Sequence, residues 1–316
     1  MVYLFKDRGK IMPRISVIMP VYNVENYIDE AVQSILSQTF SDFELLIFDD
    51  LSSDSTCERI SRLKDSRIKL FNMEMKSSLP IIKNYALSKV NGEYIAFMDG
   101  DDISYPERFD KELRFLSEHK DIDVVSGSHH NFGKSDRVFH LPKLDEEIKQ
   151  TMVFHTRICN GGSLLRSSIL FDNNIKFRNE FFVCEDYALW VDLMRYAKFA
   201  NIDDFVLKIR VRDQNTTSQS RVKPYRRILR KSILDQIHRE IFEYLDFNMS
   251  EDELSLFNEF VGDCSVAEHP RREVDALEEL FINMSMRAKQ HPRINQEFWQ
   301  TEFDNRLAKY RKFQFA

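Results

Sequence analysis

The chain has 316 residues, of which 43% are apolar and 30% are charged, so a packed core is available and the composition argues against wholesale disorder. Its 45 basic and 51 acidic residues leave a net charge of -6, which argues against a nucleic-acid-binding protein with a basic surface. Only 8 residues are glycine, where an average usage of ~7% would give roughly 22, and no glycine-rich motif for a dinucleotide or ATP occurs.

In the first part of the chain, short apolar runs alternate with segments in which apolar residues recur at helical spacing. Short runs of β-branched and aromatic residues predict five buried strands, at 15–19, 43–48, 68–71, 94–98 and 122–125. Helices are predicted between them, at 27–36, from a capping box formed by Ser55 and Glu58, at 79–90, and from Pro106 to about 118. This alternation is typical of right-handed βαβ units, so we predict an α/β, Rossmann-like fold with a mostly parallel sheet and flanking helices.

The pattern changes in the second half of the chain. Residues 129–140 predict a hairpin or a loop, 185–196 a helix with one apolar face, and 205–211 a strand. After about residue 218 four helical patterns follow, at 222–245, 250–262, 271–289 and 294–312. We therefore divide the chain into an N-terminal extension over 1–13, an α/β domain over 14–220 and a C-terminal helical region over 221–316.

An acidic run at 99–102 follows the fourth predicted strand. Asp99, Asp101 and Asp102 suit a divalent cation, because Mg²⁺ and Mn²⁺ prefer oxygen ligands and close carboxylates repel one another unless a cation neutralises them. The alternative is that these residues cap the helix predicted from Pro106. Ligands of parallel sheets bind beyond the carboxyl ends of the strands, which is where this run lies.

Two further polar clusters are candidates for the same site. Tyr22 and Asn23 follow the first strand and Asp50 follows the second, so an aromatic ring and hydrogen-bonding groups could hold a nucleobase at the sheet edge. Glu185 and Asp186 begin an apolar helix, where a carboxylate that points into a cleft could act as a general base. For both clusters the alternative is a turn or a helix cap.

Together these clusters and the strands before them resemble the pattern of glycosyltransferase family 2, whose members have the GT-A fold. The matching stretches are SVIMPVYN at 16–23, SILSQT at 34–39, FELLIFDDLSSD at 43–54, GEYIAFMDGDD at 92–102 and EDYALW at 185–190. The resemblance extends from about residue 14 to 220 and so covers the predicted α/β domain.

The resemblance implies a role for each cluster. Donor-binding positions are Pro20, Tyr22, Asn23, Asp50, Lys83, Asn84, Asp99, Gly100, Asp101, Gly162, Glu185 and Arg212. Asp101 and Asp102 would hold Mn²⁺ or Mg²⁺, and Asp186 would be the catalytic base that takes the proton of the acceptor hydroxyl. Two positions depart from the family pattern: Leu51 replaces a glycine, and Arg212 stands where a histidine is common, although an arginine could bind the diphosphate directly.

The implied activity is that of a metal-dependent, inverting glycosyltransferase of the bacterial surface-polysaccharide type. It would move one hexosyl or N-acetylhexosaminyl unit from a nucleotide sugar, a UDP-sugar first, to a hydroxyl of a glycan or lipid-linked glycan. Two other functions stay open. One is a nucleotidyltransferase that makes the sugar nucleotide, although its usual G-x-G-T-R loop is absent. The other is a non-catalytic glycan-binding protein on a transferase fold.

Several features bear on where the protein acts. We expect a cytoplasmic protein, because no secretory signal and no run of ~18 apolar residues occur. Cys57, Cys159, Cys184 and Cys264 form no C-x-x-C pair, which predicts free thiols in a reducing compartment. The basic stretch 221–231 predicts either a solvated helix face or a patch for the inner face of the cytoplasmic membrane, worth about 1 kcal/mol per basic residue.

Overall fold

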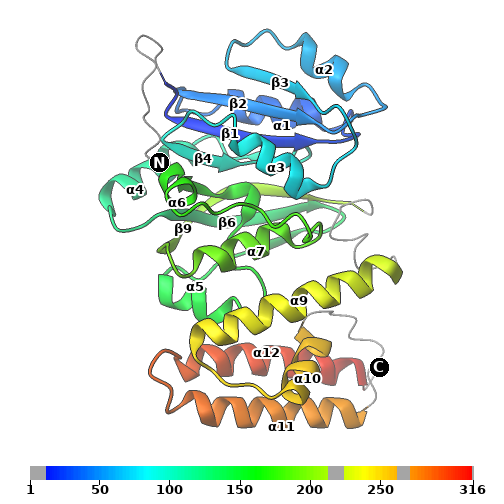
Figure 1. Cartoon of the computed structure of the whole chain (residues 1–316), viewed down its shortest axis with the longest axis vertical. Helices are drawn as coiled ribbons and strands as arrows, with labels where there is room; N and C mark the ends of the chain where they lie inside the picture. Colours follow the sequence, from blue (N-terminus) through cyan, green and yellow to red (C-terminus); the bar gives the residue numbers. More distant parts are fainter. Residues whose placement is uncertain (1–11, 213–223, 262–270, 315–316) are drawn as a thin grey trace.

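The computed structural model describes residues 12–212, 224–261 and 271–314. In Figure 1 a mixed β-sheet with flanking helices occupies the upper and middle parts of the molecule, and the C-terminal helices lie below it. Within the described residues the sheet has nine strands, in the order β3-β2-β1-β4-β8-β6-β9-β5, with β7 paired to β6. The predicted α/β fold and the helical C-terminal region are both confirmed.

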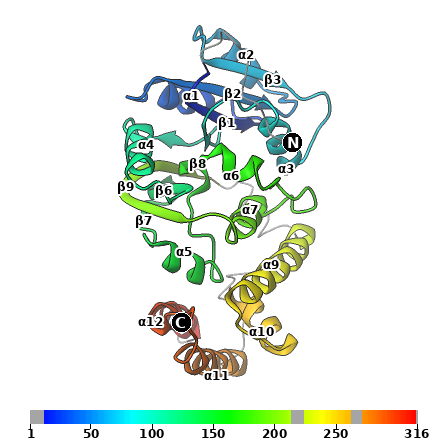
Figure 2. The ribbon, with the colours of Figure 1, turned by 60° about the vertical axis from the view of Figure 1, so that its left-hand side comes forward.

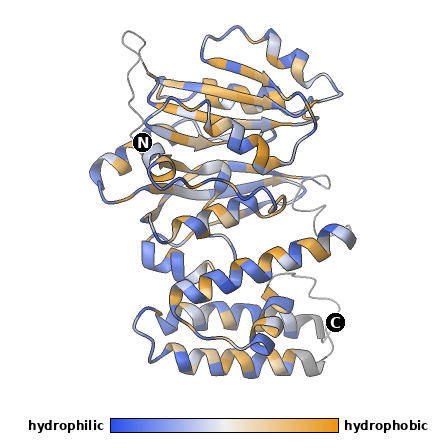
Figure 3. Cartoon of the chain, viewed as in Figure 1, coloured by the Kyte–Doolittle hydropathy of each residue, from blue (hydrophilic) through white to orange (hydrophobic). Residues whose placement is uncertain are grey.

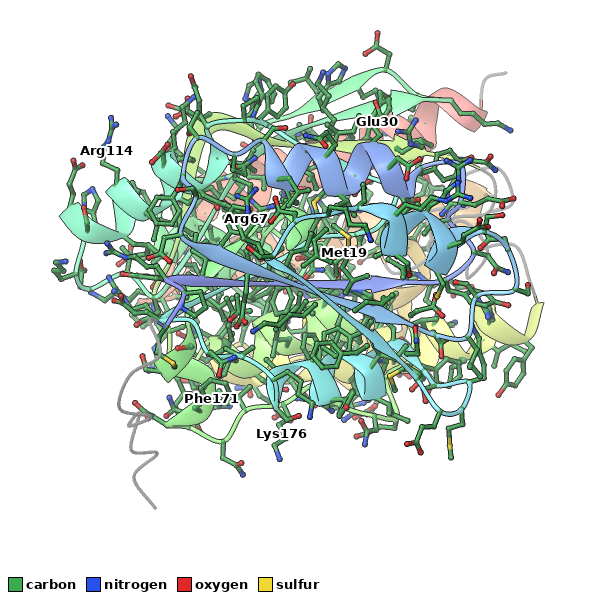
Figure 4. All side chains as sticks on the ribbon, turned by 90° about the horizontal axis from the view of Figure 1, so that it is seen from above. Met19, Glu30, Arg67, Arg114, Phe171 and Lys176 are labelled. Atoms are coloured by element: carbon green, nitrogen blue, oxygen red, sulfur yellow. The ribbon has the colours of Figure 1, made fainter. Side chains whose placement is uncertain are left out.

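The first half of the sheet is parallel and is built from apolar runs. β1 (Ile15–Val21), β2 (Phe43–Asp49), β3 (Ile68–Asn72) and β4 (Tyr94–Phe97) pair in the order β3-β2-β1-β4. The helices α1 (Ile28–Leu36), α2 (Thr56–Arg62) and α3 (Leu79–Leu87) alternate with these strands. The buried side chains of α1 and α3 pack in different core clusters on the two faces, so every residue of β2 is buried. Figure 4 shows Met19 beneath α1 in one of these clusters.

The second half of the sheet is mixed. The short strand β8 (Leu164–Arg166) enters antiparallel between β4 and β6 (Val124–Gly133). β9 (Phe199–Val211) runs parallel to β6, and β5 (Ile103–Ser104) pairs with β9 directly after the acidic loop 99–102. This pairing brings the last residues of β9 beside the acidic loop.

The remaining elements of the α/β part are short. They are α4 (Arg108–Glu118), α5 (Asp145–Thr151), the 3-10 helix η1 (Asn160–Gly162), α6 (Ser167–Phe171), α7 (Glu185–Leu193) and β7 (Arg137–Phe139). β7 and β6 form a hairpin, one of the two structures that the sequence allowed for 129–140. The sequence did not predict β5, α5, η1, β8 or α6, because elements of two to seven residues carry too little periodicity to be recognised.

The C-terminal helices lie within a few residues of their predicted bounds. They are α9 (Pro224–Leu245), α10 (Glu251–Val261), α11 (Arg271–Ala288) and α12 (Gln296–Gln314). One hydrophobic cluster runs from Phe48 in the sheet through Trp190 of α7 to Phe257 and Trp299 in these helices. Figure 2 shows α9 beside α7, and Figure 3 shows apolar residues striped along the C-terminal helices. The helical region therefore packs on α5 and α7, which lie between it and the sheet.

Two local predictions are wrong. Ser55 precedes α2 but makes no side-chain capping bond, because Asp54 accepts from the Thr56 amide at 3.0 Å and takes that role. These local hydrogen bonds outweigh partial burial and lower the pKa of Asp54. Pro106 lies before α4 rather than in its first turn, since the helix begins at Arg108.

The described residues include three of the four cysteines. No disulfide joins Cys57, Cys159 or Cys184 to another described cysteine, and Cys264 lies outside the described residues. In the described ranges we find no helix with the length and apolar character that crossing a bilayer requires. The N-terminal extension lies outside the described residues up to position 11.

Candidate active site

A cleft of about 1780 Å³ opens at the carboxyl ends of β1, β2 and β4. Its walls come from the acidic loop, η1, the start of α7, the β6–β7 hairpin, and the helices α9 and α12. Most of the predicted site residues line it together: Pro20, Tyr22, Asn23, Asp50, Lys83, Asp99, Gly100, Asp101, Asp102, Glu185, Asp186 and Arg212. Tertiary packing thus joins segments that lie far apart in the sequence.

At one end of the cleft an aromatic ring lies next to a buried carboxylate. Tyr22 is 47% exposed, and the Lys76 ammonium lies 2.8 Å from the centre of its ring. Asp50 is buried, accepts from the Ser77 amide at 2.8 Å and forms an ion pair with Lys76 at 2.6 Å. Once the exposed Lys76 side chain moves from the ring, a planar base can stack on Tyr22 and place its polar edge toward Asp50.

The turn beside this end is held in a left-handed backbone conformation. Leu51 has φ of 56° and Asn23 has φ of 50°, a region that glycine adopts without strain. Asn23 fixes the turn, because its amide donates to Ser52 and its side-chain oxygen accepts from the Ser53 amide. The leucine therefore keeps a turn of the kind that favours glycine.

The acidic loop places several carboxylates close together in a largely buried part of the cleft. Burial raises the pKa of Asp99 to about 6, although Lys83 opposes the shift. Burial and the neighbouring Asp99 and Asp101 raise the pKa of Asp102 well above its ordinary value. A Cβ at Gly161 would lie 3.7 Å from Asp99 Oδ2 and 3.8 Å from Asp102 Oδ2, so both carboxylates approach η1.

Two arginines at the end of β9 contact this loop: Arg210 lies in the strand and Arg212 directly follows it. Arg212 donates to Asp101 Oδ2 through both Nε and Nη2, at 2.8 and 2.7 Å. The Arg210 amide donates to Asp102 Oδ1 at 2.8 Å. Gly100 is required here, because a Cβ would lie 2.7 Å from Val21 Cγ1.

The chemistry of the donor set fits a hard divalent cation. Asp99, Asp101 and Asp102 offer only oxygen atoms, and their crowding makes a neutralising cation favourable. Among the described residues no group of three His, Cys, Asp or Glu side chains is arranged to hold a metal ion alone. Mg²⁺ and Mn²⁺ sites that use one or two carboxylates complete their shell with phosphates and water, so this arrangement is compatible with them.

The two acidic residues at the start of α7 differ in their surroundings. Glu185 is buried and bonds the Lys83 ammonium at 2.8 Å, with 2% of the lysine and 8% of the glutamate side chain exposed. Asp186 is partly exposed to the cleft, and its Oδ1 accepts from the Tyr187 amide at 2.8 Å. Cys184 has φ of 64° and turns the chain immediately before them. Asp186 is thus open to a reacting group, whereas Glu185 anchors Lys83.

Lys83 is held as an ammonium by carboxylates. Its burial acts to lower its pKa, but Glu185, Asp186 and Asp99 together raise the pKa above the ordinary value. Burial raises the pKa of Glu185, against the opposing effect of Lys83. This cation bonds Glu185 of α7 and is also stabilised electrostatically by Asp186 and by Asp99 of the acidic loop.

The structure does not bring two predicted residues into the cleft. Asn84 Nδ2 donates to the Phe177 carbonyl at 2.8 Å, and its Oδ1 accepts from the Phe177 amide at 2.9 Å, so it fastens the segment before α7. Gly162 is buried against β9, where a Cβ would lie 2.7 Å from Val206 Cγ2. Its neighbour Gly161 lines the cleft instead.

Several cleft residues were missed by the sequence reasoning. His129 stacks on Phe139 with ring centres 4.8 Å apart, and both line the wall made by the β6–β7 hairpin. Arg226 and Arg230 of α9 also line the cleft. They belong to the basic stretch 221–231, whose residues 221–223 lie outside the described residues. Their spacing of four residues was the available signal that they share a helix face.

Comparisons with known proteins show what the chain is similar to. The family model "Glycosyl transferase family 2" matches residues 16–179. An uncharacterized glycosyltransferase of Haemophilus influenzae is 29% identical over 65% of this chain and 68% of its own length. The putative glycosyltransferase EpsE of Bacillus subtilis is 36% identical over 49% of this chain, which spans only 57% of EpsE. The UDP-Glc:alpha-D-GlcNAc-diphosphoundecaprenol beta-1,3-glucosyltransferase WfgD of Escherichia coli is 31% identical over 60% of this chain and 82% of its own length.

Solved structures share the fold at low sequence identity. TarS 1-349 of S. aureus in complex with UDP-GlcNAc has a TM-score of 0.64 and 20% identity, covering 95% of this chain and 91% of that chain. The mannosyltransferase PcManGT from Pyrobaculum calidifontis, in complex with GDP-Man and Mn²⁺, has a TM-score of 0.55 and 14% identity, covering 96% and 88%. In both cases the similarity includes most of the C-terminal helices.

Proposed function

Because the chain belongs to glycosyltransferase family 2, we propose that it transfers one sugar from a nucleotide sugar to a hydroxyl group of a glycan or lipid-linked glycan. The observation that carries this proposal is one cleft that brings together the aromatic ring of Tyr22, the acidic loop and the partly exposed carboxylate of Asp186. We propose a UDP-sugar as donor, supported by the UDP-Glc in the name of WfgD and the UDP-GlcNAc bound to TarS. The diphosphoundecaprenol in the name of WfgD supports a role in bacterial surface polysaccharide synthesis.

The donor would lie with its base at Tyr22 and Asp50 and its diphosphate at the acidic loop. Asp101 and Asp102 would hold Mn²⁺ or Mg²⁺, as supported by the Mn²⁺ in the PcManGT complex. When bound, the ion supplies positive charge that stabilises the departing nucleoside diphosphate. Arg212, which pairs with Asp101, would then be free to bind a diphosphate oxygen.

Transfer would proceed in one displacement. Asp186 takes the proton of the acceptor hydroxyl as that oxygen forms a bond to the anomeric carbon. The bond from the anomeric carbon to the diphosphate oxygen breaks on the opposite face, so an α-linked donor gives a β-linked product. General-base assistance of this kind contributes typically about 10²–10⁴-fold to the rate.

Nucleotide release from a panel of UDP-, GDP- and dTDP-sugars, with and without Mn²⁺ and Mg²⁺, tests the proposal. We expect slow, metal-dependent release from one donor and its loss in Asp102→Ala. Metal-independent release, or release that Asp102→Ala leaves unchanged, would contradict the assignment of the acidic loop. If calorimetry detects binding of no nucleotide, the donor site itself is wrong.

A further inference from the structure

The cleft carries opposite charge at its two ends. The end formed by the sheet is lined by the carboxylates of the acidic loop and of Asp186. The end formed by α9 and α12 is lined by an arginine wall, which consists of Arg226, Arg230 and Arg306. Glu302 is the one carboxylate that the described parts of these two helices add to the lining. The second end of the cleft therefore has an excess of positive charge.

Arg230 has no acidic partner in the described part of the chain. Its Nη1 contacts Cys184 Sγ at 2.8 Å, and its Nε is buried without a hydrogen bond. Arg226 lies one helical turn earlier on the same face of α9 and is half-buried, and among the described residues it too forms no ion pair. Two guanidinium groups thus face the cleft with most of their donors uncommitted.

Arg306 adds a third guanidinium to this end. It is 8% exposed, and its Nη2 donates to the Phe154 carbonyl at 3.0 Å. Its Nε makes no hydrogen bond and lies 3.9 Å from Glu302, which already bonds Arg157. One carboxylate therefore faces two buried arginines. Burying a charge is unfavourable unless it is paired, so this arrangement favours an anion in addition to the carboxylates of the described residues.

The neighbouring histidines do not add to this charge at neutral pH. The neighbouring cations Arg157 and Arg306 act to lower the pKa of His155, whose side chain is exposed in the cleft. Burial is the main cause that lowers the pKa of His238 to about 4, and Arg306 and Arg230 act in the same direction. Both rings are neutral hydrogen-bonding groups beside the arginine wall.

We propose that the arginine wall binds a phosphate group carried by the acceptor, an inference that rests on the proposed transferase function. Guanidinium groups bind phosphate oxygens in bidentate fashion, which suits this excess of free donors. Arg230 contacts Cys184, two residues before Asp186, so one acceptor molecule can reach both the wall and the base. Leu234, Val261 and Phe154 line the same part of the cleft and provide an apolar surface for an alkyl chain beyond the phosphate.

Calorimetric titration of the full chain with geranyl diphosphate tests the inference. The protein is first saturated with UDP and Mg²⁺, so that the probe cannot occupy the donor end. The double variant Arg226→Gln/Arg230→Gln removes both uncommitted cations of α9. Lys231→Gln is the matched control, because Lys231 is exposed on the same helix and its replacement removes the same type of charge.

We expect the double variant to bind geranyl diphosphate at least about 10-fold more weakly than the unmodified protein, because it loses two charged hydrogen-bond donors for the phosphate. Lys231→Gln should leave the affinity unchanged. Equal affinity in the double variant, or no binding of the probe to the unmodified protein below about 1 mM, would overturn the inference. Equal binding of inorganic diphosphate would assign the wall to a free anion and overturn the acceptor assignment.

The affinity for UDP separates this inference from the proposed function. The double variant should keep the UDP affinity and the slow, metal-dependent nucleotide release, which also shows that it is folded. If the unmodified protein fails to bind UDP, the donor site is wrong, and the titration is repeated without UDP to test the wall alone. Loss of UDP binding in the double variant only would show that these arginines serve the donor, which contradicts the acceptor role.

Discussion

Replacing Asp186 with asparagine should abolish transfer and leave the protein stable, whereas Glu185→Gln should lower stability. The two carboxylates are adjacent in sequence, but one is open to the cleft and the other is buried against Lys83. Asparagine at 186 can still accept from the Tyr187 amide through its side-chain oxygen, so the local geometry of α7 is retained. It can no longer accept the proton of an acceptor hydroxyl.

The expected magnitudes follow from these surroundings. For Asp186→Asn, kcat should fall about 10²–10⁴-fold, the effect of losing a general base. Its free energy of unfolding should change by no more than about 0.5 kcal/mol, as for other substitutions outside the core. For Glu185→Gln the stability loss should be about 3 kcal/mol, the low end for breaking a buried pair, because Asp99 and Asp186 still stabilise Lys83. That loss corresponds to a fall in Tm of roughly 6–12 °C.

Three measurements on the same protein preparations check this assignment. Initial rates of product formation give kcat, calorimetric titration gives the UDP affinity, and thermal unfolding gives Tm. Asp186→Asn should have a lower kcat with unchanged UDP affinity and Tm. Glu185→Gln should have a lower Tm whatever its kcat. Near-normal turnover of Asp186→Asn would refute the base assignment, and an unchanged Tm for Glu185→Gln would refute the structural role of the Lys83 pair.

Further outcomes follow from other parts of the structure. Leu51→Gly should keep the free energy of unfolding or raise it by up to about 1 kcal/mol, because Leu51 is 46% exposed and its positive φ is strained. Chemical unfolding measures the change, and a loss of more than about 1 kcal/mol would contradict the strain. Burial raises the pKa of Glu112 to about 7, although Arg108 opposes the shift. The folded protein therefore keeps the Glu112 proton to higher pH than the unfolded chain does. The free energy of unfolding, relative to that of Glu112→Gln, should fall by about 3 kcal/mol as pH rises from 4.5 to 7. Chemical unfolding at a series of pH values measures this fall. Flotation with vesicles that contain anionic lipid should recover the protein if the basic stretch 221–231 binds membranes, and recovery equal to that with neutral vesicles would remove that prediction.

The parallel part of the sheet could be predicted because each strand is buried on both faces. The runs at 15–19 and 43–48 are apolar for that reason, and the helices between them show the periodicity of a single buried face. By contrast, β8 has three residues and β5 has two, so nothing in their local sequence distinguishes them from loops. Their pairing depends on β6 and β9, which are distant in the chain.

The sequence by itself determined which chemical groups this protein can use. The acidic run, the pair at 185–186 and the aromatic residue after the first strand can be read without any coordinates, and so can the family that they indicate. The positions of strand ends also predicted that these groups would meet at one edge of the sheet.

Only the tertiary structure decided which of the candidate residues are buried and which face the cleft. The family resemblance assigned different roles to Glu185 and Asp186, but the local sequence does not show that one is buried and the other open, because that difference arises from Lys83, a residue on another helix. The spacing of Arg226 and Arg230 shows that they share a face of α9, but the packing of α9 on α7 turns that face toward the cleft. Periodicity defines a helix face, whereas the surface that it meets is set by long-range packing.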